Sequence, residues 1–132
     1  MAVYEPPQPI TVIQCQGDAD PVVPFAGREN AYLSAWDTVR KWVYWNGTSA
    51  DPEVYEYPKI AAEDPTTVVK YVYGNGRDGT KVIFYHVKNG GHAWPGGPQY
   101  RPVEMIGWAS EQIALSREIW EDLKEVRLSS AH

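Results

Sequence analysis

His92 lies in the glycine-rich stretch 90–97 (GGHAWPGG), directly after a run of apolar residues. An imidazole titrates near neutral pH, so it can accept a proton and return it within one reaction. Asp20 lies in a second loop that also follows an apolar run, and Pro21 restrains the backbone just beyond it. A carboxylate that orients a histidine and a histidine that activates a hydroxyl are two of the three members of a nucleophilic triad. The two loops therefore predict the acid and the base of a hydrolytic site.

The residue types alone do not identify which aspartate is the acid or which residue is the nucleophile. Asp18 lies two residues nearer the apolar run and is an alternative to Asp20, and either aspartate can instead stabilise a turn. A nucleophilic serine of the G-x-S-x-G type does not occur in this sequence. The internal serines considered for the role do not lie between two glycines, and they are Ser34, Ser49 and Ser110.

The two loops need strands to position them. Residues 10–16 are largely apolar and are closed by Gly17, which predicts a short buried strand before the Asp20 loop. The run is apolar throughout, without alternation, which is typical of a strand covered on both faces. Such a strand needs a neighbour on each side.

A helix is expected after this strand. Asn30 is a suitable N-cap, and Gly47 is suited to a left-handed C-cap. Between them, apolar residues recur at helical spacing, namely Tyr32, Trp36, Val39 and Val43. The following segment, 48–64, is rich in Pro, Asp and Glu, so we expect an irregular surface crossing there.

Residues 66–73 and 81–87 are dense in β-branched and aromatic residues, which predicts two strands. The sequence GNGRDG at 74–79 between them matches G-x-G-x-x-G. A dinucleotide site would require these glycines to open a helix, whereas here a strand follows. We therefore interpret 74–79 as the turn of a β-hairpin and predict no nucleotide site.

A final helix is predicted to begin near Ser110, with its apolar side formed by Ile113, Ile119, Trp120 and Leu123. The predicted order is strand, helix, hairpin and helix. Three strands and two helices favour an α/β layer arrangement. The 132 residues, 43% of them hydrophobic, suffice for one globular domain but are too few for two ordinary ones.

Composition excludes several classes of partner. The net charge is -5, and the sequence has no cluster of Lys and Arg that could neutralise phosphates. We therefore expect no nucleic-acid partner. No stretch has the length of a membrane span, and none is expected to bind a membrane. Cys15, the single cysteine, is predicted to be a buried and inert thiol, which favours a reducing, cytoplasmic location. The site needs no cofactor. His86 and His92 are spaced unlike zinc ligands, so no metal is predicted.

Two motifs resemble one known family. The stretch 17–27 (GDADPVVPFAG) resembles the acid loop of the polyhydroxybutyrate depolymerase and feruloyl esterase group of α/β-hydrolases. The stretch 90–97 is similar to the histidine motif of that group, and 106–120 resembles its final helix. The resemblance implies that Asp20, not Asp18, is the triad acid and that His92 is the triad base. Trp94 neighbours His92, so its aromatic ring either packs against the rest of the domain or lines the substrate pocket.

The resemblance covers nearly all of this chain but only the C-terminal half of such an enzyme. It implies that residues 1–132 form one partial α/β-hydrolase domain, with a β-hairpin and flanking helices, whose nucleophile half is absent. The implied activity is hydrolysis of a small-molecule or polymeric carboxylic ester by a serine outside this chain. The implied partner is a second chain carrying that serine, or a homo-oligomer. Gln16 stands where the family usually has a histidine, and Thr48 and Asn75 stand where secreted relatives carry cysteines.

A second hypothesis remains open. The chain can instead be a catalytically inactive descendant that serves as a binding or assembly module. An exposed sheet edge left by the absent strands would then favour self-association or a partner chain.

Overall fold

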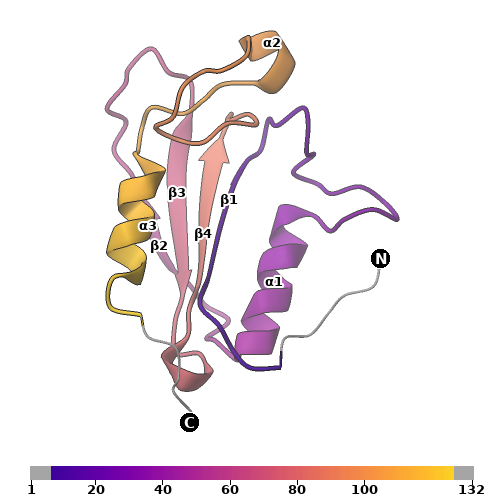
Figure 1. The fold of residues 1–132 in the computed structure, drawn as a ribbon, viewed down its shortest axis with the longest axis vertical. Coiled ribbons are helices and arrows are strands. Elements are labelled where there is room, and N and C mark those ends of the chain that lie inside the picture. The colour runs from indigo at the N-terminus through magenta and orange to yellow at the C-terminus, as the bar shows by residue number, and fades with distance from the viewer. Residues whose placement is uncertain (1–6, 127–132) are drawn as a thin grey trace.

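The structure is a computed structural model that describes residues 7–126. It is a mixed α/β fold built on one four-stranded sheet with the strand order β1-β4-β3-β2 (Figure 1). β1 runs parallel to β4, whereas the β4–β3 and β3–β2 pairs are antiparallel. The strands are β1 (Val12–Gly17), β2 (Glu53–Glu56), β3 (Thr67–Tyr73) and β4 (Val82–Lys88).

Helices cover both faces of the sheet. The helical elements are α1 (Ala35–Asn46), the 3₁₀ turn η1 (Arg77–Gly79), α2 (Val103–Ile106) and α3 (Leu115–Leu123). Successive residues of β4 point to opposite faces. Phe84 accordingly packs with Val39 of α1, whereas Tyr85 packs with Leu115 of α3. α1 and α3 thus lie on opposite sides of the strands (Figure 1), and the core has two halves divided by the sheet.

The predicted strands and the hairpin are confirmed. β1, β3 and β4 begin and end within two residues of the predicted segments. β3 and β4 form an antiparallel hairpin, and within its turn Asn75, Asp78 and Gly79 have positive φ angles. The glycine-rich sequence between the strands therefore serves the turn and opens no long helix.

The prediction for segment 48–64 is wrong in one part. Glu53–Glu56 forms the short strand β2, which pairs with β3 and makes a fourth strand where three were expected. All four residues of β2 are exposed. Because β2 has no buried face, its sequence lacks the apolar alternation by which strands are predicted.

The predicted start of the first helix is also wrong. α1 begins at Ala35, and its N-cap is Ser34, whose side chain accepts a hydrogen bond from the Asp37 amide at 3.0 Å. Asn30 lies in the turn before the helix with a φ of 61°. At the other end the prediction is confirmed, because Gly47 caps the helix in the left-handed conformation.

The final helix begins five residues later than expected, at Leu115. Ser110 is not its N-cap but is buried, and it accepts a hydrogen bond from the Thr66 hydroxyl at 2.7 Å. Trp120, assigned to the apolar side, is 64% exposed. α2 was not predicted. Within residues 7–126, no helix is both long enough and apolar enough to cross a membrane.

β1 is an edge strand. It pairs with β4 along one side, and none of the described residues pairs with its other side. Its residues Val12 to Gln16 are accordingly half-buried. Asn46 holds the start of this strand region against α1, because its fully buried amide group both donates to and accepts from the backbone of Ile10.

Candidate active site

The loops that follow β1 and β4 meet at one end of the sheet. Because the two strands are parallel, their C-terminal ends lie together there, and the segment containing α2 lies at the same end (Figure 1). The amide of Asp18 donates to the Val87 carbonyl at 3.1 Å, and the amide of Ala19 donates to the Gly90 carbonyl at 2.9 Å. The backbone therefore joins the predicted acid loop to the predicted histidine loop.

Asp20 and His92 are in direct contact. The Nδ1 atom of His92 lies 3.0 Å from Oδ2 of Asp20. Oδ1 of Asp20 accepts the amides of Val22 and Val23 at 2.7 and 2.8 Å, so the carboxylate is fixed by its own loop. The carboxylate side chain is only 5% exposed, whereas the imidazole is 42% exposed. This arrangement lets a carboxylate hold Nδ1–H and leaves Nε2 to act as a base.

The backbone of His92 is held from the opposite side by segment 100–108. Its amide donates to the Ile106 carbonyl at 2.6 Å, and its carbonyl accepts the Tyr100 hydroxyl at 2.9 Å. A Cβ on Gly91 would lie 2.0 Å from the Ile106 carbonyl oxygen. The glycine before His92 is thus required by this close approach. Tyr100 was not identified from the sequence, because a tyrosine in a Gly- and Pro-rich loop carries no signal of its partner.

Asp18, the alternative acid, binds a different histidine. Its Oδ2 lies 3.0 Å from Nε2 of His86, and its Oδ1 accepts the Asn89 amide at 2.7 Å. The His86 ring stacks on Phe25 with ring centroids 4.8 Å apart. The structure therefore brings Asp20, not Asp18, to His92. His86 packs on the same face of β4 as Phe84, and their ring centroids are 5.9 Å apart.

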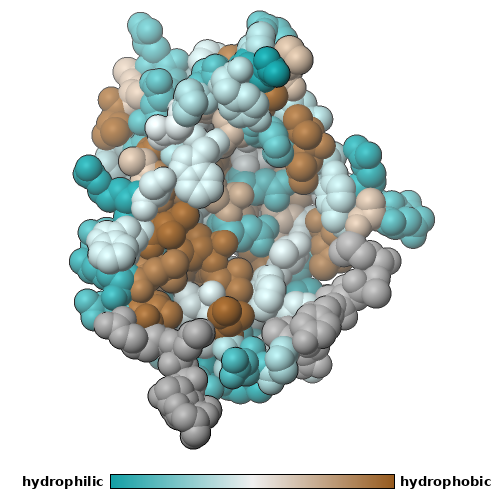
Figure 2. All heavy atoms as spheres, in the orientation of Figure 1, coloured by the Kyte–Doolittle hydropathy of each residue, from teal (hydrophilic) through white to brown (hydrophobic). Residues whose placement is uncertain are grey.

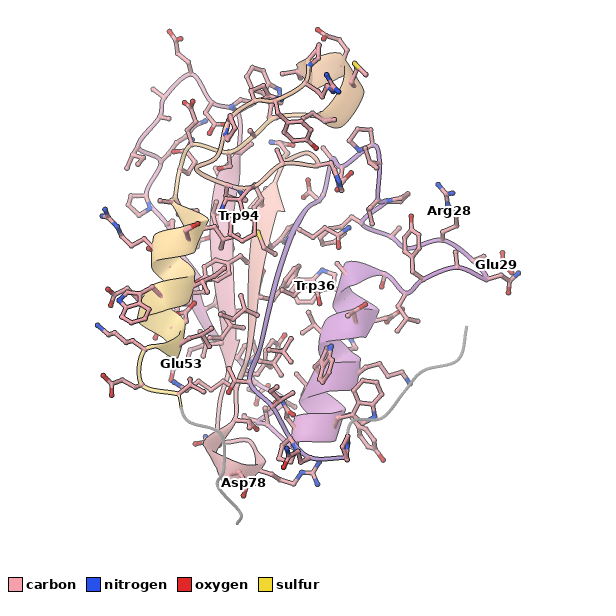
Figure 3. The ribbon with its side chains drawn as sticks, viewed as in Figure 1. Arg28, Glu29, Trp36, Glu53, Asp78 and Trp94 are labelled. Atoms are coloured by element: carbon pink, nitrogen blue, oxygen red, sulfur yellow. The ribbon has the colours of Figure 1, made fainter. Side chains whose placement is uncertain are left out.

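A cleft of about 500 Å³ opens beside the pair. Most of its lining is apolar, and Figure 2 shows hydrophobic side chains gathered between α3 and β1 on this face. Trp94 lies near the start of α3 (Figure 3), where its indole N–H donates to the Ser116 hydroxyl at 3.1 Å. The residues that line the cleft include Ile13, Cys15, Asp20, Val87, His92, Trp94, Tyr100, Trp108, Leu115 and Ile119.

Cys15 lies at this cleft, where its environment disfavours the thiolate. Burial raises the pKa of its thiol to about 12, and a thiol with such a high pKa carries little of the nucleophilic thiolate. The prediction of a buried thiol is met only in part, because Cys15 is half-buried.

The serines considered as nucleophiles have other roles. Ser34 caps α1, and Ser49 hydrogen-bonds within its own turn to the backbone of Asp51. Ser110 lines the cleft, where it is buried and accepts a hydrogen bond from the Thr66 hydroxyl. Within residues 7–126, no serine hydrogen-bonds to His92, and no group of three or more potential metal-binding side chains was found.

Comparison with known proteins gives one relative. The chain is 30% identical over 128 residues to a protein of Nocardia uniformis subsp. tsuyamanensis named "Putative esterase NocK". The match covers 86% of this chain and 37% of that protein, so the chain spans little more than a third of the length of the curated relative. No protein-family model matches the chain. No solved structure matches it either. The chain is thus a mixed α/β protein with distant similarity to a protein named as an esterase.

Proposed function

We propose that this chain supplies the acid and the base of a serine ester hydrolase of the α/β-hydrolase type. The observation that carries the proposal is the contact between Asp20 and Nδ1 of His92 at the head of an apolar cleft. The similarity to a protein named as an esterase supports the same class of reaction. The motifs at 17–27 and 90–97 favour the polyhydroxybutyrate depolymerase and feruloyl esterase group within it.

The proposed chemistry assigns each side chain one task. Nε2 of His92 takes the proton of a serine hydroxyl as the serine oxygen attacks the ester carbonyl carbon. The imidazolium then protonates the departing alcohol, leaving an acyl-serine. In the second half, His92 takes a proton from water, which attacks the acyl carbon and releases the acid and the free serine. Asp20 keeps Nδ1 protonated and stabilises the imidazolium in both halves.

The serine and the donors that stabilise the oxyanion come from a polypeptide segment outside the described residues. The free edge of β1 supports this arrangement, since a further parallel strand can pair there and continue the sheet. Trp94 would form one wall of the pocket for the acyl or alcohol group, because it lines the cleft beside His92.

The test uses the protein together with the polypeptide that supplies the serine, with each substitution introduced into the gene for this chain. Asp20→Asn and His92→Ala are each expected to lower kcat for a p-nitrophenyl ester by about 10⁴-fold or more. Glu29→Gln is the control, because Glu29 lies at the tip of a loop away from the cleft (Figure 3). Undiminished hydrolysis in either site variant would refute the proposal.

A second candidate is a binding or assembly module without catalysis. The unpaired edge of β1 and the apolar cleft beside it favour this candidate, because both are surfaces that a partner can cover. A fluorophosphonate probe separates the two candidates. Labelling of a serine on an accompanying polypeptide, dependent on His92, supports the hydrolase, whereas a stable complex that resists labelling supports the module.

A further inference from the structure

A second aspartate–histidine contact lies beside the first. Asp18 and Asp20 are separated by one residue, and each binds a different histidine of the β4 region. His86 belongs to β4 itself, where it is paired in register with Gln16 of β1 and with Val69 of β3. The proposed hydrolysis gives this second pair no role.

The surroundings of His86 determine which ring nitrogen carries a proton. A carboxylate only accepts hydrogen bonds, so Nε2 of His86 donates to Asp18. Nδ1 is buried and has no hydrogen-bond partner among the described residues. The ring is enclosed by aromatic side chains, namely Phe25, Trp36 and Phe84. An imidazole that leaves one nitrogen unsatisfied in an apolar setting incurs a cost, which the contact with Asp18 offsets.

Asp18 also links His86 to the loop that carries His92. Asp18 uses its other oxygen to accept the Asn89 amide, and Asn89 has a φ of 62°, which is uncommon for a residue other than glycine. From Asn89 the chain turns through Gly90 and Gly91 to His92. The Asp18 carboxylate therefore connects His86 of β4 to the left-handed turn at Asn89. Asp18 itself belongs to the loop that carries Asp20, two residues later.

We propose that His86 and Asp18 are positioning residues for the Asp20–His92 pair. His86 holds the Asp18 carboxylate, and Asp18 holds the turn that sets the orientation of the His92 ring. The contact also occupies Asp18, so that Asp20 is the acid available to Nδ1 of His92. The catalytic meaning of this role rests on the proposed function, but the positioning itself does not.

Three substitutions of His86 separate positioning from packing. In His86→Gln the side-chain nitrogen can take the place of Nε2 and still donate to Asp18. In His86→Asn the shorter amide corresponds to the Nδ1 position and cannot reach Asp18. His86→Phe keeps an aromatic ring among Phe25 and Phe84 but loses the donor. If His86 is a positioning residue, His86→Gln preserves the proton on Nδ1 of His92, whereas His86→Asn and His86→Phe do not. If His86 serves only packing, His86→Phe preserves it.

The readout is the protonation of the two ring nitrogens of His92, measured by ¹⁵N–¹H NMR on the whole chain above the titration of the imidazole. The chain has three histidines, so substitution of each in turn assigns the signals. In the unaltered chain and in His86→Gln, we expect the proton on Nδ1, toward Asp20. In His86→Asn and His86→Phe, we expect a mixture in which at least about a third of the rings carry the proton on Nε2.

Two further variants complete the test. Asp18→Ala leaves the His86 ring packed and is expected to give the same mixture, so the test does not depend on the stability of the His86 variants. Lys88→Gln, on the same face of β4 and exposed, is the matched control and is expected to leave His92 unchanged. An unaltered His92 in Asp18→Ala, or equal spectra for His86→Gln and His86→Asn, would overturn the proposal. Because no ester is cleaved in this measurement, its outcome is independent of whether the proposed hydrolase function is correct.

Discussion

A Cβ atom placed on Gly17 would lie 2.2 Å from the carbonyl oxygen of Gly90. The ends of β1 and β4 therefore approach each other more closely than any side chain permits. This approach is what allows the amide of Ala19 to reach the Gly90 carbonyl, and it brings Asp20 within hydrogen-bond distance of His92. Gly17 is therefore needed because the two backbones pass too close for a side chain there, whatever conformational freedom it also gives the loop.

Gly17→Ala tests this close approach. The added methyl group must push the two strand ends apart, so we expect the free energy of unfolding to fall by about 1–3 kcal/mol. Gly74→Ala is the matched control, because a Cβ there meets no atom within 4 Å, and a change within about 0.5 kcal/mol is expected. Urea unfolding of both variants measures the difference, and equal stabilities would contradict this account of Gly17.

Asp20 has a structural role that can be separated from its proposed catalytic one. Asp20→Ala removes the acceptor of the Val22 and Val23 amides, and we expect it to lower stability by about 1–2 kcal/mol. Asp20→Asn keeps an acceptor oxygen for these amides and is expected to lose less than half as much. Thermal and urea unfolding compare the two variants. An asparagine variant as unstable as the alanine variant would show that the charge, not the loop contact, dominates.

Asp122 joins α3 to the sheet. Its carboxylate is 7% exposed, forms an ion pair with Lys70 and accepts the hydroxyl of Tyr85. Asp122→Ala leaves both partners without their acceptor in a largely buried setting, so a loss of about 2–4 kcal/mol is expected. Glu121→Ala breaks an exposed ion pair one residue earlier and is the control, with a loss below about 0.5 kcal/mol. Similar losses in the two variants would mean that Asp122 does not anchor the helix.

Cys15 provides a prediction on pH. Burial raises the pKa of its thiol from 9.0 to about 12, so the folded chain keeps a proton that the unfolded chain releases. The contribution of Cys15 to stability is therefore present below pH 9 and declines as the pH rises from 9 to 12. We expect Cys15→Ala to show a shallower loss of stability over this range. In the native chain, alkylation by iodoacetamide at pH 8 should be at least about 100-fold slower than in urea, and rapid alkylation would refute the assignment.

Those parts of the fold with a strong local signal could be predicted from the sequence. The hairpin of β3 and β4 has dense β-branched residues on both sides of a glycine-rich turn, and Gly47 ends α1 as expected. The start of α1 could not be located, because Asn30 and Ser34 are both good N-caps and only the tertiary fold selects Ser34. β2 could not be predicted either, since its pairing with β3 is long-range and its residues are all exposed.

The contacts of the candidate site could be predicted where the residues lie in recognisable motifs. They could not be predicted where they depend on how the strands pair. Asp20 and His92 lie in distinctive loops, and the structure places them in contact. The contact between Asp18 and His86 joins positions 68 residues apart and depends on the pairing of β1 with β4. Tyr100 likewise meets His92 only because segment 100–108 folds back over the histidine loop.

The buried side chain of Asn46 has a consequence for modification of this chain. Asn46-Gly47-Thr48 is an acceptor sequence for N-linked glycosylation. The nitrogen to which a glycan would be attached donates instead to the Ile10 carbonyl at 2.7 Å, and the residue has no exposed surface. A sugar on this nitrogen would separate the end of α1 from the chain entering β1. In the folded state this sequence is therefore closed to glycosylation, whichever compartment the protein occupies.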